Sequence, residues 1–176
     1  MQTRPMRRLT RLKSFDYRAA GAYFITICTF GRECLLGQIV HDRPVLSDIG
    51  RVVTKAWLAI PAHFFDVSLG DFVVMPNHVH GILVLRDVGA KHASPLHLPP
   101  RGTSPGSLAA ILQSFKSAAS RGVNQQQGTP GRKLWQRGFY DHVIRDDEEL
   151  NRLRRYIEDN PLRWALDEEN PSKVKP

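Results

Sequence analysis

Residues 72–85 read FVVMPNHVHGILVL, and this stretch indicates the fold class most directly. β-Branched and aromatic residues lie on both sides of the Pro76-Asn77 pair, which predicts a strand, a turn and a second strand over residues 78–85. Side chains alternate between the two faces of a strand. We therefore expect His78 and His80 to share one face of a sheet, with Val79 in the core on the other face.

The flanking sequence supplies the other elements of an α+β fold. A β-branched and aromatic run predicts a strand over residues 22–30, with a hairpin partner within residues 35–40. Ser47 and Ser107 each precede apolar residues at helical spacing, which predicts capped helices over residues 48–63 and from residue 108 onward. Residues 134–145 are predicted to form a turn followed by a strand. A third helix begins in the acidic run at 146–149 and ends near Asn160-Pro161.

This order of elements, β(β)–α–β–β–α–β–α, predicts an α+β sandwich with helices packed on a mainly antiparallel sheet, of the ferredoxin-like or RNA-recognition-like type. The length of 176 residues suits one domain. We expect a basic N-terminal arm at residues 1–21 and a single domain at 22–166, followed by a polar C-terminal tail at 167–176. Gly-, Pro- and Ser-rich or polar composition predicts flexible loops at 88–106 and 124–133.

Hydropathy and cysteine content exclude several classes of protein. No apolar run approaches the ~18 residues of a membrane helix, and the basic N-terminus leads into no secretory signal segment. Cys28 and Cys34 alone can supply neither a disulfide framework nor a four-ligand zinc site. We therefore expect a cytoplasmic protein without a membrane partner.

Positive charge is concentrated in two stretches of the chain. Lys and Arg number 25 against 17 Asp and Glu, which gives a formal net charge of +8. Residues 1–13 hold five basic side chains and residues 88–140 hold seven, and neither stretch contains an acid. Segregated positive charge indicates a surface for nucleic acid, because each neutralised phosphate releases counterions. A solvated basic face that keeps the protein soluble is the alternative.

Two groups of residues can carry chemistry. The imidazoles of His78 and His80, about 7 Å apart along one strand, can both reach one divalent cation, but two partly exposed polar residues on the outer face of a strand give the same pattern. Tyr156 lies at the edge of the buried face of the third helix, and Asn160 follows one turn later on the same side. A tyrosine there has two possible roles. It is a residue at the edge of the core whose hydroxyl is hydrogen-bonded, or it lies over the sheet with its hydroxyl available for chemistry.

Together these residues suggest phosphodiester chemistry. A metal held by the histidines would polarise a phosphodiester, and the tyrosine hydroxyl would attack phosphorus to form a covalent intermediate. A phosphodiester linked to the protein keeps the energy of the bond, so the strand can be rejoined without ATP. This is the logic of a tyrosine nuclease or strand transferase.

The chain resembles the single-tyrosine HUH transposases of the IS200/IS605-like group, and among them the REP-associated tyrosine transposase branch. The hydrophobic–His–hydrophobic–His pattern around His78 and His80 is similar to the HUH motif. Four segments carry the resemblance in the order of the family: DYRAAGAYFITICTFGRECLLG (16–37), FVVMPNHVHGILVL (72–85), LWQRGFYDHVIRDDEEL (134–150) and RRYIEDNPLRW (154–164). The resemblance implies the HUH endonuclease fold in a bacterial, nucleoid-associated protein that is a monomer, with a dimer as the alternative.

The resemblance also implies roles for individual residues. Tyr156 matches the catalytic tyrosine that forms a 5′-phosphotyrosine and frees a 3′-hydroxyl, and His78 and His80 match the ligands of Mg²⁺ or Mn²⁺. Asn160 matches a polar metal-site residue that is typically Gln in IS200-like enzymes, and the shorter Asn fits the REP-associated branch. The implied partner is single-stranded or hairpin DNA of palindromic repeat elements, which the enzyme would cleave and rejoin.

Basic residues near these motifs are candidate DNA contacts. They are Arg7, Arg8 and Arg11 in the N-terminal arm, Lys133 and Arg137 beside Trp135, and Arg154 and Arg155 beside the tyrosine.

The sequence leaves rival interpretations open. Tyr140 is a rival nucleophile by its chemistry alone, and His142 is expected to have a structural or DNA-proximal role. A non-catalytic single-stranded nucleic-acid-binding protein on the same fold explains the charge equally well, although no RNP1-like run is present. A small relaxase-type HUH nuclease is a further alternative, as is a copy that binds DNA without cutting it.

Overall fold

The computed structural model describes residues 20–86, 106–167 and 170–171, and within them a four-stranded antiparallel sheet organises the fold. Its order is β4-β5-β1-β6. The strands are β1 (Gly21–Cys28), β4 (Val67–Val74), β5 (His78–Leu85) and β6 (Tyr140–Ile144). A second sheet pairs β2 (Gly37–Val40) with β3 (Arg43–Leu46). The helical elements are η1 (Phe30–Arg32), α1 (Asp48–Leu58), α2 (Ile60–His63), α3 (Leu108–Gln127), α4 (Asp147–Asp159) and η2 (Trp164–Leu166).

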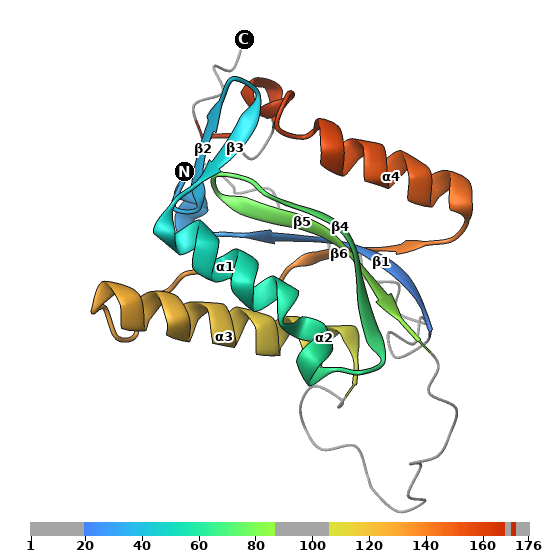
Figure 1. The fold of residues 1–176 in the computed structure, drawn as a ribbon, viewed down its shortest axis with the longest axis horizontal. Helices are drawn as coiled ribbons and strands as arrows, with labels where there is room; N and C mark the ends of the chain where they lie inside the picture. The colour runs from blue at the N-terminus through green and yellow to red at the C-terminus, as the bar shows by residue number, and fades with distance from the viewer. Residues whose placement is uncertain (1–19, 87–105, 168–169, 172–176) are drawn as a thin grey trace, which may run out of the picture.

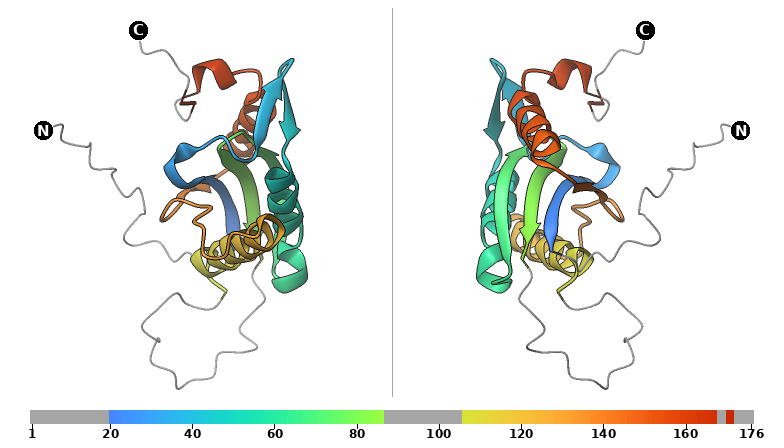
Figure 2. Two further views of the ribbon diagram at one scale, coloured as in Figure 1. Left: turned by 90° about the vertical axis from the view of Figure 1, so that its left-hand side faces the viewer. Right: turned by 90° about the vertical axis from the view of Figure 1, so that its right-hand side faces the viewer.

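The strand order is that of a ferredoxin-like sandwich. Counted along the chain, the four main strands lie in the order second, third, first, fourth, and they are linked as β–α–β–β–α–β. Helices α1 and α3 cover one face of the sheet and α4 covers the other, so the sheet lies between two helical layers (Figures 1 and 2). The predicted α+β sandwich is confirmed.

The face toward α1 and α3 carries the main hydrophobic core. Tyr23 and Ile25 of β1 are fully buried there, and so is Val79 of β5, as strand alternation predicted. Trp57 of α1 packs so closely on Gly81 that a Cβ atom on this glycine would lie 2.4 Å from the Trp57 Cζ2 atom. This packing holds α1 against the centre of the sheet, and the alternate residues of β5 face α4.

The predicted helix caps are confirmed, but two helix boundaries are wrong. The Gly50 amide donates to Ser47 Oγ at 3.1 Å, and Ser107 Oγ accepts from the third residue after it in the same way. The helix expected over residues 48–63 ends at residue 58 and restarts as α2, because Pro61 has no amide proton to continue the ladder. Helix α3 extends to residue 127, inside the loop predicted at 124–133, and ends where Gly128 adopts a φ of 64°.

The strand predicted within residues 35–40 has a different partner from the one expected. It forms β2, which pairs with β3 and not with β1. Both edges of β1 are already occupied, by β5 and by β6, so β1 has no edge left for a hairpin partner. The chain turns away from the sheet in η1, where Gly31 adopts a φ of 65°.

Some sequence expectations fall outside the described residues. These include most of the N-terminal arm, loop positions 88–105 and the candidate DNA contacts Arg7, Arg8 and Arg11. Among the helices that the structure describes, none is long and apolar enough to cross a bilayer.

Candidate active site

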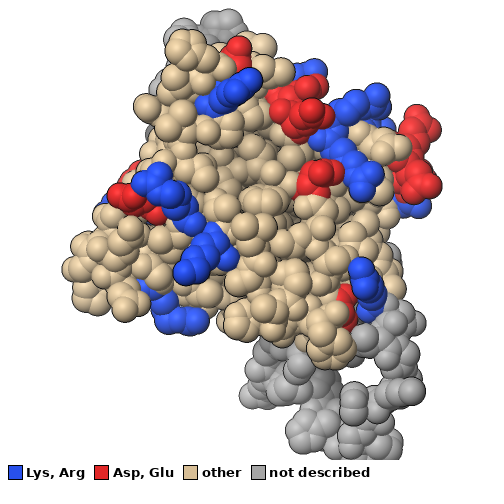
Figure 3. Space-filling view, in the orientation of Figure 1, with Lys and Arg blue, Asp and Glu red and all other residues tan. Residues whose placement is uncertain are grey.

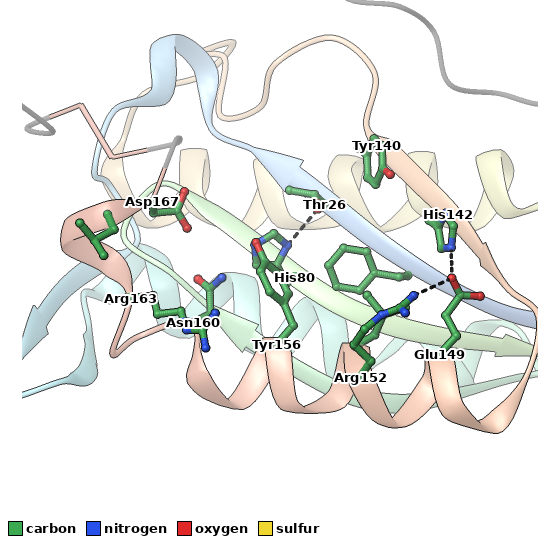
Figure 4. A pocket seen from close by; sticks show the side chains of 13 residues that line it. Thr26, His80, Tyr140, His142, Glu149, Arg152, Tyr156, Asn160, Arg163 and Asp167 are labelled. Atoms are coloured by element: carbon green, nitrogen blue, oxygen red, sulfur yellow. Dashed lines mark hydrogen bonds and ion pairs between the residues drawn. The ribbon is translucent and has the colours of Figure 1, made fainter. Parts of the chain in front are cut away.

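A cleft of about 740 Å³ lies between the sheet and α4. One wall comes from β1, β5 and β6, and the other comes from α4 and the segment that follows it (Figure 4). On this face only a small hydrophobic cluster joins the two layers, with Phe24, Ile82 and Ile157 as its buried members. His80 and Tyr156 both line the cleft, and so does Asn160, so the structure brings these predicted site residues together.

The two histidines are buried on the face toward α4. His78 is 0% exposed and His80 is 4% exposed, and their ring centroids are 4.4 Å apart. This burial excludes the alternative of two partly exposed polar residues on an outer strand face. A buried polar side chain needs partners, so the surroundings of each ring decide what the pair can do.

Each imidazole is held by a hydrogen bond at Nδ1. His78 Nδ1 lies 2.9 Å from Asn77 Oδ1, and the Asn77 amide is oriented because its Nδ2 donates to the Arg32 carbonyl oxygen at 3.1 Å. Since Asn77 Oδ1 can only accept, His78 Nδ1 carries the proton and Nε2 keeps a lone pair. His80 Nδ1 lies 2.9 Å from Thr26 Oγ1.

Three buried polar atoms at this end of the cleft have no hydrogen-bond partner within the described part of the chain. They are Nε2 of His78, Nε2 of His80 and Oδ1 of Asn160. Histidines that are held at one ring nitrogen and open at the other are typical of metal ligands. One ligand atom from each histidine and one carboxylate oxygen of Asp167 all lie within 4.8 Å of one another. These residues therefore fit a divalent cation.

Asp167 is the member of this group that sequence analysis missed. It follows η2 directly, in the segment assigned to the polar tail. The ring centroid of Trp164 in η2 lies 6.0 Å from that of His78, so η2 packs against the histidine end of the site. The one sequence signal was the apolar Trp164-Ala165-Leu166 run after Pro161, which is typical of a segment that packs on the domain.

Burial keeps both imidazoles neutral at neutral pH. Burial lowers the pKa of His78 from 6.5 to about 4, while the Asp167 carboxylate and the Asn160 amide act in the opposite direction. Burial, with His78 nearby, holds the pKa of His80 well below its ordinary value. A neutral imidazole is the form that binds a cation.

Tyr156 lies over His80 at the opening of the cleft. The two ring centroids are 5.3 Å apart, and the tyrosine ring is also 5.9 Å from that of Phe24 in an edge-on arrangement. The residue is 40% exposed. A phosphate that enters this cleft can therefore meet the tyrosine and the histidine end of the site together (Figure 4).

The other end of the cleft contains a charged network. The Glu149 carboxylate accepts from His142 Nε2 at 2.8 Å and from the Arg145 amide at 2.9 Å, and Arg152 Nη2 lies 3.2 Å from the same carboxylate. These hydrogen bonds, that of the Arg145 amide first, hold the pKa of Glu149 below its ordinary value. Tyr140, the rival nucleophile of the sequence analysis, lines this end of the cleft and lies two residues before His142.

The structure separates the basic residues on and after α4 into two groups. Arg152 of α4 and Arg163 of the segment that follows it, which sequence analysis did not name, line the cleft four residues before and seven residues after the tyrosine. Arg154 Nε lies 3.0 Å from Asp71 Oδ2 of β4, and Arg155 lies among acidic side chains on the outer surface of α4. Figure 3 shows acidic and basic side chains side by side over this helix. Helical spacing contained the signal for Arg152, because a residue four positions before another shares its face of the helix.

The described candidates Lys133 and Arg137 do not line this cleft. Lys133 Nζ is 5.5 Å from the ring centroid of the exposed Phe30, and Arg137 is exposed nearby in sequence. Trp135 is buried and its Nε1 donates to the Lys116 carbonyl oxygen at 3.2 Å, so it is a core residue. The aromatic ring available to a ligand here is that of Phe30.

Comparisons with known proteins bear on the family and on the fold of the chain. No family model matches the chain. An uncharacterized protein of Haemophilus influenzae is 38% identical over 168 residues, which cover 92% of each chain. Among solved structures, a REP-associated tyrosine transposase bound to a REP hairpin is 17% identical with a TM-score of 0.61, over 88% of this chain and 74% of its own. A candidate transposase of Deinococcus radiodurans is also 17% identical, with a TM-score of 0.47 over 86% of this chain and 97% of its own.

The first solved structure is similar enough to compare the folds, and at 17% identity the likeness concerns the fold alone. The fold implied by the resemblance to single-tyrosine transposases is therefore confirmed. The chain belongs to the same protein family as the Haemophilus influenzae protein, and it has the fold of the REP-associated tyrosine transposase.

Proposed function

We propose that the protein is a metal-dependent tyrosine transposase, which nicks single-stranded DNA beside hairpin-forming palindromic repeats and rejoins it. One observation carries this proposal: Tyr156 lies over His80, which is paired with the buried His78, and neither Nε2 atom has a hydrogen-bond partner among the described residues. The shared fold supports it, because the similar transposase structure is bound to a REP hairpin. Tyr156, His80, Asn160 and Asp167 of one chain line the same cleft, which supports a monomer as the active form.

His78, His80 and Asp167 would hold the divalent cation, Mg²⁺ or Mn²⁺, with Asn160 Oδ1 as a further ligand. A divalent cation bound there supplies positive charge that polarises a phosphoryl oxygen. Imidazole nitrogens suit transition metals better than Mg²⁺, whereas the carboxylate and amide oxygens suit both ions. We therefore expect tighter binding of Mn²⁺ than of Mg²⁺.

Tyr156 is the nucleophile in this proposal. Its phenol loses a proton to water in the cleft, and the phenolate oxygen forms a bond to phosphorus as the bond from phosphorus to O3′ breaks. The departing O3′ takes the electron pair and a proton and leaves as a 3′-hydroxyl. Rejoining is the reverse: a 3′-hydroxyl attacks the phosphotyrosine and releases the phenol, so no external energy source is needed.

Arg152 and Arg163 would contact the DNA backbone inside the cleft, because both line it and both side chains are largely exposed. Lys133 beside the exposed Phe30 would also contact the DNA backbone, together with Arg137 and with Arg7, Arg8 and Arg11 of the N-terminal arm. Such contacts position the strand without reading its sequence.

The test is a covalent-adduct assay. Labelled single-stranded oligonucleotides that carry hairpins from the flanks of the gene are incubated with the protein and Mn²⁺, Mg²⁺ or EDTA, and the products are separated on a denaturing protein gel. We expect a shifted protein–DNA band that requires the metal and disappears in Tyr156→Phe and in His80→Asn. Lys55→Gln, an exposed change on α1 at the other face of the sheet, should form the adduct normally.

An adduct that forms with Tyr156→Phe would contradict the assignment of the nucleophile. Tight DNA binding without any adduct, across several hairpins and both metals, would favour a non-catalytic single-strand binder instead.

A further inference from the structure

We propose that the end of the cleft away from the histidines binds the nucleotide next to the scissile phosphate, with Arg152 as its phosphate contact and Tyr140 as its stacking surface. This proposal rests on the proposed function, because it takes Tyr156 as the nucleophile. It assigns a role to a group of residues that the metal and the nucleophile do not use.

The size of the cleft is the first argument. Its volume of about 740 Å³ is in the range of sites that enclose a whole small ligand, roughly 300–1,000 Å³. His80 and Asp167 line one end of it, with Tyr156 over His80, and a metal with one phosphate would need only that end. The other end, between β6 and the first two turns of α4, leaves room for a further part of the substrate (Figure 4).

The spacing along α4 is the second argument. Arg152 lies one turn before Tyr156 on the same helix face, which corresponds to about 6 Å along the helix axis. A side chain at this separation lies beside the nucleophile. If the scissile phosphate of a DNA strand faces Tyr156, Arg152 can therefore contact the neighbouring phosphate of the same DNA strand. The strand would then run along α4 through the length of the cleft.

The side chain of Arg152 is held by Glu149 and is accessible to solvent. One of its donors is directed to Glu149 Oε1 at 3.2 Å, while its side chain is 66% exposed. Glu149 is itself fixed, because its carboxylate also accepts from His142 Nε2 and from the Arg145 amide. A guanidinium carries five donors, so an arginine held by one of them can still offer a pair to a phosphate.

Tyr140 faces Arg152 across the cleft from β6 (Figure 4). It is 42% exposed, and it pairs across the sheet with Thr26, the residue that holds His80. An exposed tyrosine ring stacks on any base, since every base has a π-face. The subsite would therefore hold a nucleotide without selecting its base strongly.

Helix capping alone would explain part of this network. The Glu149 amide bonds to Asp146 Oδ1 at 2.7 Å while its carboxylate returns to the Arg145 amide, an arrangement similar to a capping box. Capping accounts for Glu149, but it accounts neither for the exposed arginine that Glu149 holds nor for Tyr140 opposite it. An experiment must therefore separate a lost phosphate contact from a weakened helix start.

The salt dependence of DNA binding makes this separation. For single strands, log Kobs falls with log[salt] at a slope of about −0.7 for each phosphate contact, so losing one contact makes the slope shallower by about 0.7. Binding of a labelled hairpin oligonucleotide is measured by fluorescence anisotropy between 50 and about 200 mM salt. All variants carry Tyr156→Phe, so that no covalent bond forms.

In that background we expect Arg152→Gln to make the slope shallower by about 0.7 and Arg152→Lys to retain it. Tyr140→Ala should weaken binding about 5- to 150-fold without changing the slope. Asp146→Ala removes the cap but not the arginine, and Lys55→Gln removes one charge on the other side of the sheet. Both should keep the slope of the parent.

An unchanged slope in Arg152→Gln, or the same loss in Asp146→Ala or Lys55→Gln, would overturn the subsite. The protein without Tyr156→Phe is assayed in parallel for the covalent adduct. If the adduct forms while the slope of Arg152→Gln is unchanged, the subsite and the backbone contact of Arg152 are wrong, but the proposed nucleophile and metal site stand. If neither binding nor adduct is observed, the proposed function itself is wrong, and the subsite with it.

Discussion

The two faces of the sheet are built differently, although the same strands form both. Toward α1 and α3, β1 and β5 bury apolar side chains such as Ile25 and Val79 in one large cluster. Toward α4, β5 presents His78 and His80, and the apolar cluster there has three buried members among the described residues. We infer from this difference that the face toward α1 and α3 supplies most of the stability. The face toward α4 is less tightly packed and contains the cleft with the unpartnered polar atoms.

Removing the largest side chain of the apolar face should have the greatest effect on stability. Trp57→Ala deletes a fully buried indole that packs on Phe115 and Phe72, and we expect the free energy of unfolding to fall by about 3–5 kcal/mol. Urea denaturation monitored by circular dichroism measures it. A loss below about 1 kcal/mol would contradict the view that this face carries the stability.

Filling the metal site should stabilise the α4 face. At a free Mn²⁺ concentration 100 times the dissociation constant, binding raises the free energy of unfolding by about 3 kcal/mol. The increase should be lost in EDTA, and it should be much smaller in Asp167→Asn, which removes a carboxylate of the group formed with the two histidines. Urea denaturation at pH 7 with and without Mn²⁺ provides the measurement. Equal stabilisation of both proteins would exclude Asp167 as a ligand.

Acidification should lower the free energy of unfolding through the histidines on the α4 face and not through the apolar face. The pKa of His78 is about 4 in the folded protein and 6.5 in the unfolded chain, so between these values the unfolded chain binds more protons and stability falls as the pH falls. From pH 7 to pH 5 in EDTA, we expect the free energy of unfolding to fall by about 2 kcal/mol from His78 alone, and His80 acts in the same direction. The buried apolar cluster contains no group that titrates in this range.

Urea denaturation at the two pH values measures this difference, with His78→Asn as the matched variant. The variant should lose less stability than the unmodified protein on the same acidification. Parallel pH profiles for the two proteins would show that His78 is not the group responsible.

The ion pair that joins α4 to β4 should contribute least to the free energy of unfolding. Arg154 and Asp71 are both about half exposed, and a pair in such surroundings is worth less than about 1 kcal/mol. Arg154→Gln should therefore change the free energy of unfolding by less than this amount in urea denaturation. A larger loss would mean that α4 depends on this contact more than on the cluster around Ile157.

The sequence predicted the elements whose signal is local. Alternation placed His78 and His80 on one face of β5, and the serine caps marked the starts of α1 and α3. The helical period placed Asn160 one turn after Tyr156, on the same side of the cleft. These features depend on spacing within one segment, which the sequence contains in full.

The features that the sequence missed depend on contacts between distant segments. Nothing in the spacing linked Asp167 to histidines almost ninety positions earlier, because the contact requires η2 to fold back onto β5. β2 pairs with β3 because both edges of β1 are paired with other strands, β5 and β6. Arg152 is a different case, since the helical period indicated its face, but proximity in sequence drew attention to Arg154 and Arg155.

The identity of the residue that carries the DNA tests the central claim most directly. After incubation with Mn²⁺ and the hairpin oligonucleotide, the covalent product is digested with nuclease and protease, and the modified peptide is sequenced by mass spectrometry. We predict a phosphodiester-linked nucleotide on Tyr156 and on no other residue. A nucleotide on Tyr140, or a cleaved oligonucleotide without any modified tyrosine, would contradict the account.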